Sequence, residues 1–138
     1  MIALHILKLL ANEGFGTIDT DMFFEEAPLN GQGVPKEGVW IVERGAAVTR
    51  FTTQTQNFDI YSRYTSKLTG YQKLEAILEY LQEAYGEVCD LPTVPPYSET
   101  EYKNVRITPT SSVDNVGTDE NNKVVRVISG SVQYERSL

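Results

Sequence analysis

The last third of the chain, residues 104–135, constrains the fold more than any other segment. Two runs rich in β-branched residues, Val105-Arg-Ile-Thr and Val124-Val-Arg-Val-Ile, flank a polar, acidic connection over 114–122. β-Branched residues favour strands, whereas Gly, Asn and Asp favour the turns between them. The pattern predicts a long C-terminal β-hairpin, and a two-faced ribbon of this kind is more typical of a protein that assembles than of one that turns over a substrate.

Two segments carry apolar side chains at helical spacing. Residues 2–13 form the first, and Gly14 is suited to end it in a left-handed conformation. Residues 70–85 form the second, with apolar side chains at intervals of three and four. Thr69 and Gln72 match a capping box, so this helix is predicted to begin next to them.

Three earlier strands are predicted from runs of β-forming residues at 22–24, 38–43 and 57–64. The polar stretch 49–56 is predicted to be an arm that projects beyond the sheet. The resulting order, α-β-β-β-α-β-β, predicts a single α+β domain over residues 1–138. We expect an antiparallel or mixed β-sheet with two helices packed on one face, together with the arm and the C-terminal hairpin.

The strand at 57–64 alternates in polarity, which predicts which side chains face the core. Phe58 and Ile60 fall on one face, and Tyr61 and Arg63 fall on the other.

Two further segments should interrupt regular structure. The Pro-rich residues 91–97 disfavour both a helix and a central strand, so they are predicted to be an ordered linker. Gly130 interrupts the last apolar run and is predicted to mark a β-bulge.

The overall charge is acidic, with 12 Lys and Arg against 19 Asp and Glu and a net charge of −7. Binding to nucleic acids or to anionic membranes depends on basic groups, so both are disfavoured. The apolar start of the chain contains His5 and Lys8 and lacks a basic leader and a cleavage site, which argues against a signal peptide. We expect a protein made in the cytosol.

Few residues suggest chemistry. His5 is the only histidine, and no orienting partner lies near it in the sequence, so a packed or surface histidine is predicted. The serines form no Gly-x-Ser-x-Gly motif, and the glycines form no phosphate-binding loop. Cys89, the only cysteine, is predicted to be a small buried residue.

Two groups of carboxylates are the remaining candidates for a metal or catalytic site. Asp19, Asp21, Glu25 and Glu26 form one group, and Asp114, Asp119 and Glu120 form the other. Neither group has the spacing of a calcium-binding loop, and solvated acidic edges explain both. We therefore expect no cofactor, no metal and no enzymatic activity. A small enzyme that uses a pair of carboxylates remains an alternative.

Several aromatic residues fall outside the predicted core. They are Phe51 in the arm, Tyr61 on the polar side of its strand, and Tyr97 and Tyr102 around the end of the Pro-rich segment. Tyrosine combines a large contact area with a polar tip and is common at protein interfaces. Any one of them could lie against its own domain, but we expect some to contact a partner.

Several segments of this sequence resemble the minor capsid protein family of tailed bacteriophages. They are Asn57-Phe-Asp-Ile-Tyr-Ser-Arg-Tyr-Thr, Leu68-Thr-Gly-Tyr-Gln-Lys-Leu-Glu-Ala-Ile, Cys89-Asp-Leu-Pro-Thr-Val-Pro-Pro, and Ile107-Thr-Pro-Thr leading into Val127-Ile-Ser-Gly. The resemblance covers nearly the whole chain. It rests on segments that build the fold, not on a catalytic motif. The element order is also similar to siphophage tail terminator proteins.

This resemblance implies a non-enzymatic virion protein at the head–tail junction, made in the cytoplasm of the bacterial host. It implies a ring, expected to be a hexamer, that ends the tail tube and joins it to the head-completion (stopper) protein. DNA would only pass through the lumen, without specific binding, and no membrane is involved. Contacts with other subunits or partners would come from Arg50, Phe51, Tyr61, Arg63, Tyr97, Tyr102 and Tyr134. Acidic residues in the lumen would be Asp114, Asp119 and Glu120.

An alternative interpretation assigns the protein to a different functional class. The acidic surface would then bind other proteins, and the chain would be a cytosolic protein-binding adaptor or regulator. The two interpretations predict different particle sizes, because an adaptor stays monomeric whereas a terminator forms a ring.

Overall fold

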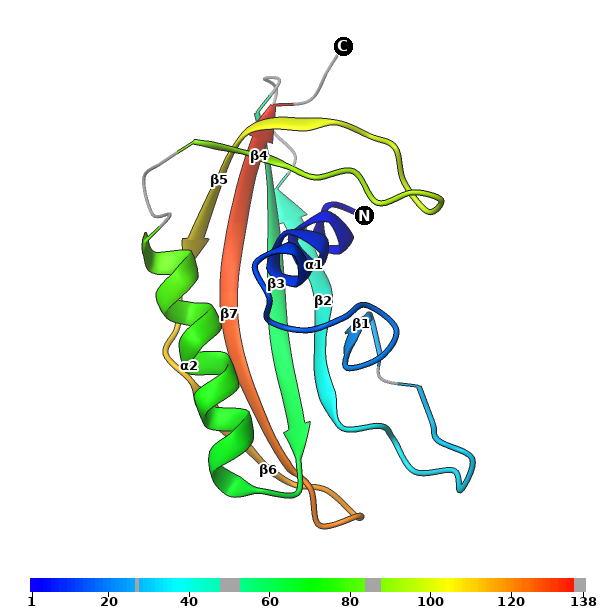
Figure 1. The fold of residues 1–138 in the computed structure, drawn as a ribbon. Helices are drawn as coiled ribbons and strands as arrows, with labels where there is room; N and C mark the ends of the chain where they lie inside the picture. The colour runs from blue at the N-terminus through cyan, green and yellow to red at the C-terminus, as the bar shows by residue number, and fades with distance from the viewer. Residues whose placement is uncertain (27, 48–52, 84–87, 136–138) are drawn as a thin grey trace.

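The computed structural model describes residues 1–26, 28–47, 53–83 and 88–135, and within them it contains two helices and seven strands (Figure 1). The helices are α1 (Ile2–Asn12) and α2 (Lys67–Glu83). The strands are β1 (Met22–Phe24), β2 (Gly38–Ala47), β3 (Thr53–Tyr64), β4 (Cys89–Leu91), β5 (Tyr102–Pro109), β6 (Asp114–Thr118) and β7 (Val124–Glu135).

The strands form one curled, mixed sheet in the order β1-β2-β3-β7-β5-β4, with β6 also paired to β7. Among the described strands, the β1–β2 pair is parallel and the other pairs are antiparallel. The predicted α+β class, with a mixed sheet and two helices, is confirmed.

Strand β7 is the central strand of this sheet. Thr53–Tyr64 of β3 pairs with it residue by residue along its whole length. On its other side, β6 pairs with the first part of β7 and β5 with the last part. The C-terminal hairpin therefore exists as β6–β7, but its second strand is central to the sheet and is paired on both sides.

Several details of the predicted hairpin region are wrong. The connection is shorter than expected, because residues 114–118 form β6. A short edge strand, β4, which the sequence pattern did not reveal, includes Leu91 at the start of the predicted linker, and the rest of that linker, residues 92–97, lies outside the helices and strands. Gly130 marks no bulge, since the β3–β7 register is continuous through it. A Cβ there would lie 2.6 Å from Cζ of Phe58, so glycine makes room for the phenylalanine ring.

The predicted arm is also wrong in part. Residues 53–56 belong to β3 and pair with β7 on one side, and Thr55 and Gln56 also pair with β2 on the other. The rest of that prediction, including Arg50 and Phe51, lies outside the described residues.

Both helix ends have a local explanation. Gly14 follows α1 with a φ of 91°, as predicted, because glycine adopts the left-handed region without a Cβ penalty. Helix α2 begins at Lys67, three residues before the predicted start, so the capping box of Thr69 and Gln72 is wrong. The hydroxyl of Ser66 instead accepts a hydrogen bond from the Thr69 N–H, at 3.4 Å.

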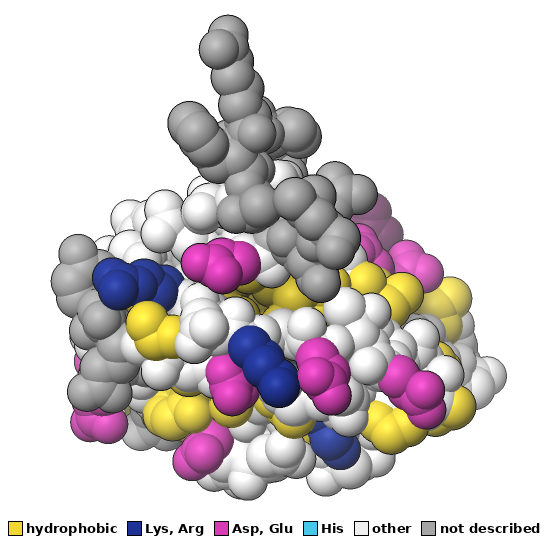
Figure 2. Space-filling model, turned by 90° about the horizontal axis from the view of Figure 1, so that it is seen from above, with side chains coloured by type: hydrophobic (Ala, Val, Ile, Leu, Met, Phe, Trp, Pro, Cys, Tyr) yellow, Lys and Arg dark blue, Asp and Glu magenta, His cyan; other side chains and the backbone are white. Residues whose placement is uncertain are grey.

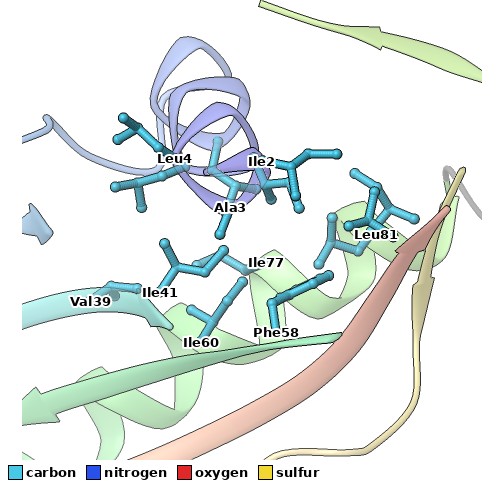
Figure 3. Packing of buried hydrophobic residues seen from close by; sticks show 14 of the residues in the cluster. Ile2, Ala3, Leu4, Val39, Ile41, Phe58, Ile60, Ile77 and Leu81 are labelled. Atoms are coloured by element: carbon cyan, nitrogen blue, oxygen red, sulfur yellow. The ribbon is translucent and has the colours of Figure 1, made fainter. Parts of the chain in front are cut away.

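The two helices cover the same face of the sheet and share one apolar core (Figure 3). Ile41 of β2 and Ile60 of β3 lie beneath α1, while Ile77 of α2 reaches the same cluster. Each side chain of this size that is fully buried contributes about 1.5–3 kcal/mol. Helix α1 is also tied to the sheet, because the Glu43 carboxylate of β2 accepts the Ala3 N–H at 3.0 Å.

Candidate functional site

His5, on α1, is the one described residue with the geometry of a catalytic base. Its Nδ1 lies 2.7 Å from the Pro92 carbonyl oxygen, and its Nε2 lies 2.8 Å from the Ser98 Oγ. A carbonyl only accepts, so Nδ1 carries the proton and Nε2 accepts the Ser98 hydroxyl. The arrangement therefore resembles a nucleophile, a base and an orienting group.

The burial of His5 favours a structural role for this triad. The imidazole is 0% exposed, so a substrate has no direct path to Nε2. Its two hydrogen bonds join α1 to both ends of the segment 92–98, which is 87 or more residues away in sequence. Of the two predicted alternatives, a packed or a surface histidine, the structure shows the packed one, and its partners lie too far along the chain for sequence reasoning to find them.

Two of the predicted interface tyrosines pack within the domain. The Tyr102 ring contacts His5 edge-on at 4.8 Å between centroids and contacts Tyr134 edge-on at 5.4 Å. Both tyrosines pack against the core cluster, and burial raises the pKa of Tyr102. The three rings therefore hold β5 and β7 under α1, and only the remaining exposed part of each tyrosine is available to a partner.

Tyr61 and Arg63 lie on the sheet face opposite the helices, as their alternation predicted. The Tyr61 ring stacks on Trp40 at 5.1 Å with an interplanar angle of 10°. The Arg63 guanidinium lies over Trp40, 4.6 Å from the ring centroid, and such contacts contribute about 0.5–2 kcal/mol. The strands β2 and β3 thus display a stack of Tyr61, Trp40 and Arg63 on the open face.

Asp59 lies on the same open face and is mostly buried there. Arg44 pairs with its carboxylate at 2.8 Å, and the Ser129 hydroxyl donates to it at 2.5 Å. Burial raises the pKa of the neighbouring Tyr61, and the charge on Asp59 raises it further. Asp59 is therefore paired with both Arg44 and Ser129.

The tip of the β6–β7 hairpin is tied to the open face through Asp119. Its carboxylate accepts the backbone N–H groups of Asn121 and Lys123 at 2.9 and 3.0 Å, and it pairs with Arg63 at 3.0 Å. Burial raises the pKa of Asp119, but the hydrogen bonds from Lys123 and Asn121 and the charge of Arg63 outweigh it and lower the pKa. Asp119 therefore shapes the turn, whereas Glu120 is exposed next to it and Asp114 is exposed at the other end of β6.

A second carboxylate fixes the same end of the molecule. Glu37 accepts the backbone N–H and the hydroxyl of Thr65 at 2.8 and 2.6 Å, and Lys123 pairs with it at 3.2 Å. The hydrogen bonds from Thr65 lower the pKa of Glu37, and Lys123 adds to the effect. The hairpin tip is therefore held by two separate ion pairs.

An apolar pocket of about 400 Å³ opens at the opposite edge of the sheet, beside β1 and the start of α1. Two carboxylates, Asp19 and Glu26, belong to a lining that is otherwise largely apolar. The residues that line it are Met1, Leu4, Ile18, Asp19, Phe23, Phe24, Glu26, Pro28 and Tyr97. Tyr97 also lines this pocket. It is 63% exposed and is the most accessible of the tyrosines that were predicted to lie at an interface.

Apolar side chains are also exposed at the start of α2. Leu68 is 67% exposed and Tyr71 is 38% exposed. The Arg126 guanidinium lies 5.4 Å from the Tyr71 ring centroid, and its Nη2 donates to the Lys67 carbonyl at 3.4 Å. This end of the helix combines accessible apolar area with the positive charges of Lys67 and Arg126.

Other candidates for chemistry find little support among the described residues. In the part of the chain that the structure describes, no three His, Cys, Asp or Glu side chains are arranged to hold a metal ion. Cys89 is half-buried and its Sγ lies 3.6 Å from the Val105 carbonyl oxygen. Burial raises the pKa of its thiol, and Asp90 raises it further. No described helix has the length and apolar character to cross a membrane.

No family model matches this sequence, and the search of curated proteins finds no match.

Proposed function

We propose that this chain is a non-enzymatic virion structural protein that forms a ring, expected to be a hexamer, at the end of a phage tail tube. The observation that carries the proposal is the placement of its apolar surface. Leu68 lies at the start of α2 and Tyr97 lines the pocket beside β1, and both side chains are well exposed. The polar groups with the best catalytic geometry, His5 and Ser98, are used to join segments of the fold. The molecule is thus better suited to contact than to catalysis.

The resemblance to phage minor capsid and tail terminator proteins supports the same proposal. The resembling segments fall on β3 and the β5–β7 pair in the middle of the sheet, on the edge strand β4 and on the start of α2. The partners would be further copies of the chain, the tail-tube protein on one side and the head-completion (stopper) protein on the other. The location would be the head–tail junction of the virion, after synthesis in the host cytoplasm.

We assign the acidic hairpin tip to the lumen of the ring. Glu120 is exposed there, Asp119 remains ionised because its pKa is lowered, and Asp114 is exposed at the other end of β6. Negative charge would repel DNA during its passage and prevent sticking. Figure 2 shows further carboxylates spread over the end of the molecule that is viewed from above, so the acidic surface is not confined to the tip.

The direct test is electron microscopy of tail tubes mixed with the purified chain. The tubes would be assembled from the tube protein that the same genome encodes. The proposal predicts a ring-shaped cap at one end of each tube and tubes that no longer elongate from that end. Bare tube ends at saturating protein would refute it.

The adaptor reading is supported by the same exposed apolar residues and by the net charge of −7. It predicts a monomer that never self-associates and that binds a separate protein at one site. Sedimentation of the chain with and without tubes separates the two proposals, because only the terminator gains mass on the tubes.

A further inference from the structure

We infer that the apolar pocket beside β1 receives the start of α2 from a neighbouring copy of the chain. This inference rests on the proposed ring and names the contact that would build it. The surface that enters the pocket, which we name the α2 knob, consists of Lys67, Leu68 and Tyr71. The acceptor is the pocket that contains Leu4, Phe24 and Tyr97, with Asp19 and Glu26 among its lining residues.

The shapes of the two surfaces fit this assignment. The pocket has a volume of about 400 Å³, which gives room for more than one side chain, and most of its lining is apolar. Leu68 is the most exposed large apolar residue of the described chain, at 67%. Tyr71 lies one helical turn away on the same side of α2, so the two side chains can enter a pocket together.

The charges are complementary as well. The pocket is lined by the carboxylates of Asp19 and Glu26. The α2 knob carries Lys67, and Arg126 lies over Tyr71. The knob also sits at the N-terminus of α2, where the helix dipole supplies further positive charge. Because the whole chain is acidic, most surfaces of a second copy would be repelled by these carboxylates, and the knob is suited to overcome that repulsion.

A single chain cannot make this contact with itself. The knob is joined to β7 through the bond between Arg126 and the Lys67 carbonyl. The pocket lies at β1, which is separated from β7 by β2 and β3. Three inter-strand spacings correspond to about 14 Å in the sheet plane alone. Figure 1 shows α2 and β1 on opposite sides of the molecule, so the knob must come from another copy.

A contact between two different surfaces repeats from copy to copy. Such a heterologous interface produces a closed ring or an open filament, depending on the rotation between neighbours. The same contact therefore accounts for a ring without any further interface. Other occupants of the pocket, such as a segment of the tube protein, would leave the knob free.

Disulfide trapping tests the inference directly. Glu26→Cys and Lys67→Cys would be introduced together in a full chain that carries Cys89→Ser, and the protein would be oxidised on tail tubes. We expect a ladder of cross-linked species that ends at one closed oligomer. The matched control replaces Lys67→Cys by Glu79→Cys, which is exposed on the same helix but lies about 18 Å away along its axis. The control should still cap the tubes but should remain uncross-linked.

A charge exchange provides the second measurement. Glu26→Lys and Lys67→Glu should each weaken self-association about three- to fivefold at low salt, and combining them should restore it. Equal cross-linking of the control pair would overturn the inference, as would capped tubes that yield no cross-link between positions 26 and 67. The second result would leave the ring itself intact. The absence of any cap on the tubes would overturn both the inference and the proposed function.

Discussion

The two faces of the sheet are built from the same strands but are held together by different forces. On the helix-covered face, Phe58 and Ile60 are fully buried beneath α1 and α2 (Figure 3). On the open face, Asp59 and Arg63 are paired with Arg44 and Asp119. The difference shows that one strand, β3, supplies a dry core on one side and a set of paired charges on the other. Large apolar side chains, such as Leu68 and Tyr97, are exposed elsewhere on the domain, and they stabilise neither face.

The largest effect should come from the covered face. Phe58→Ala removes a ring that packs on Gly130 and leaves a cavity among fully buried neighbours. We expect the free energy of unfolding to fall by about 3–5 kcal/mol, measured by urea denaturation. Phe58→Leu, which retains most of the volume, should cost much less. Equal losses for the two variants would show that this face is not close-packed.

His5 tests whether the buried polar link matters as much as the apolar packing. His5→Ala leaves the Ser98 hydroxyl and the Pro92 carbonyl without their partner and opens space next to Tyr102. The expected loss is about 2–3 kcal/mol in the same denaturation measurement. A fluorophosphonate probe should not label Ser98 in the wild-type protein. Rapid labelling that disappears in His5→Ala would instead favour an enzyme.

The open face should contribute less, and its contribution should depend on pH. The folded-state pKa of Asp119 is lowered, so the stability that it adds is complete above the unfolded value of about 4. That stability is lost as the pH falls through the lower folded-state pKa. Asp119→Asn should cost about 1 kcal/mol at pH 7 and less at pH 3, measured by urea denaturation at both values. A cost that is independent of pH would contradict the ionised pair with Arg63.

The smallest effect on stability should come from the exposed edge. Leu68→Asp changes a side chain that is 67% exposed, so the free energy of unfolding should change by no more than about 0.5 kcal/mol. Assembly, in contrast, should be abolished, because a carboxylate would meet those of the pocket. Glu79→Gln on the same helix is the matched control and should change neither property.

The sequence revealed the parts of this fold that depend on local patterns. The alternation along β3 placed Phe58 and Ile60 in the core, and Gly14 marked the end of α1. Strands β4 and β6 were missed because they are short and partly polar, and they are ordered by pairing with longer neighbours. The start of α2 was misplaced because both Ser66 and Thr69 are suitable caps, and only the packed structure distinguishes them.

The candidate site was harder to predict for the same reason. The pocket joins side chains from residues 1–28 with Tyr97, which comes from a distant segment. Ser98 is 93 residues away from His5, so no local spacing could reveal their hydrogen bond. Asp119 was recognised as acidic, but its ion pair with Arg63, which is 56 residues away, has no local sequence signal. Contacts between distant segments need the three-dimensional arrangement.

The mass of the particle that the chain forms on tail tubes tests the central claim most directly. Native mass spectrometry of the caps released from tubes should give one discrete oligomer for the wild-type chain, expected to be six copies. Leu68→Asp, which we expect to fold with nearly unchanged stability, should give only monomer. A wild-type chain that stays monomeric with and without tubes would contradict the account that this protein works by contact between its own copies.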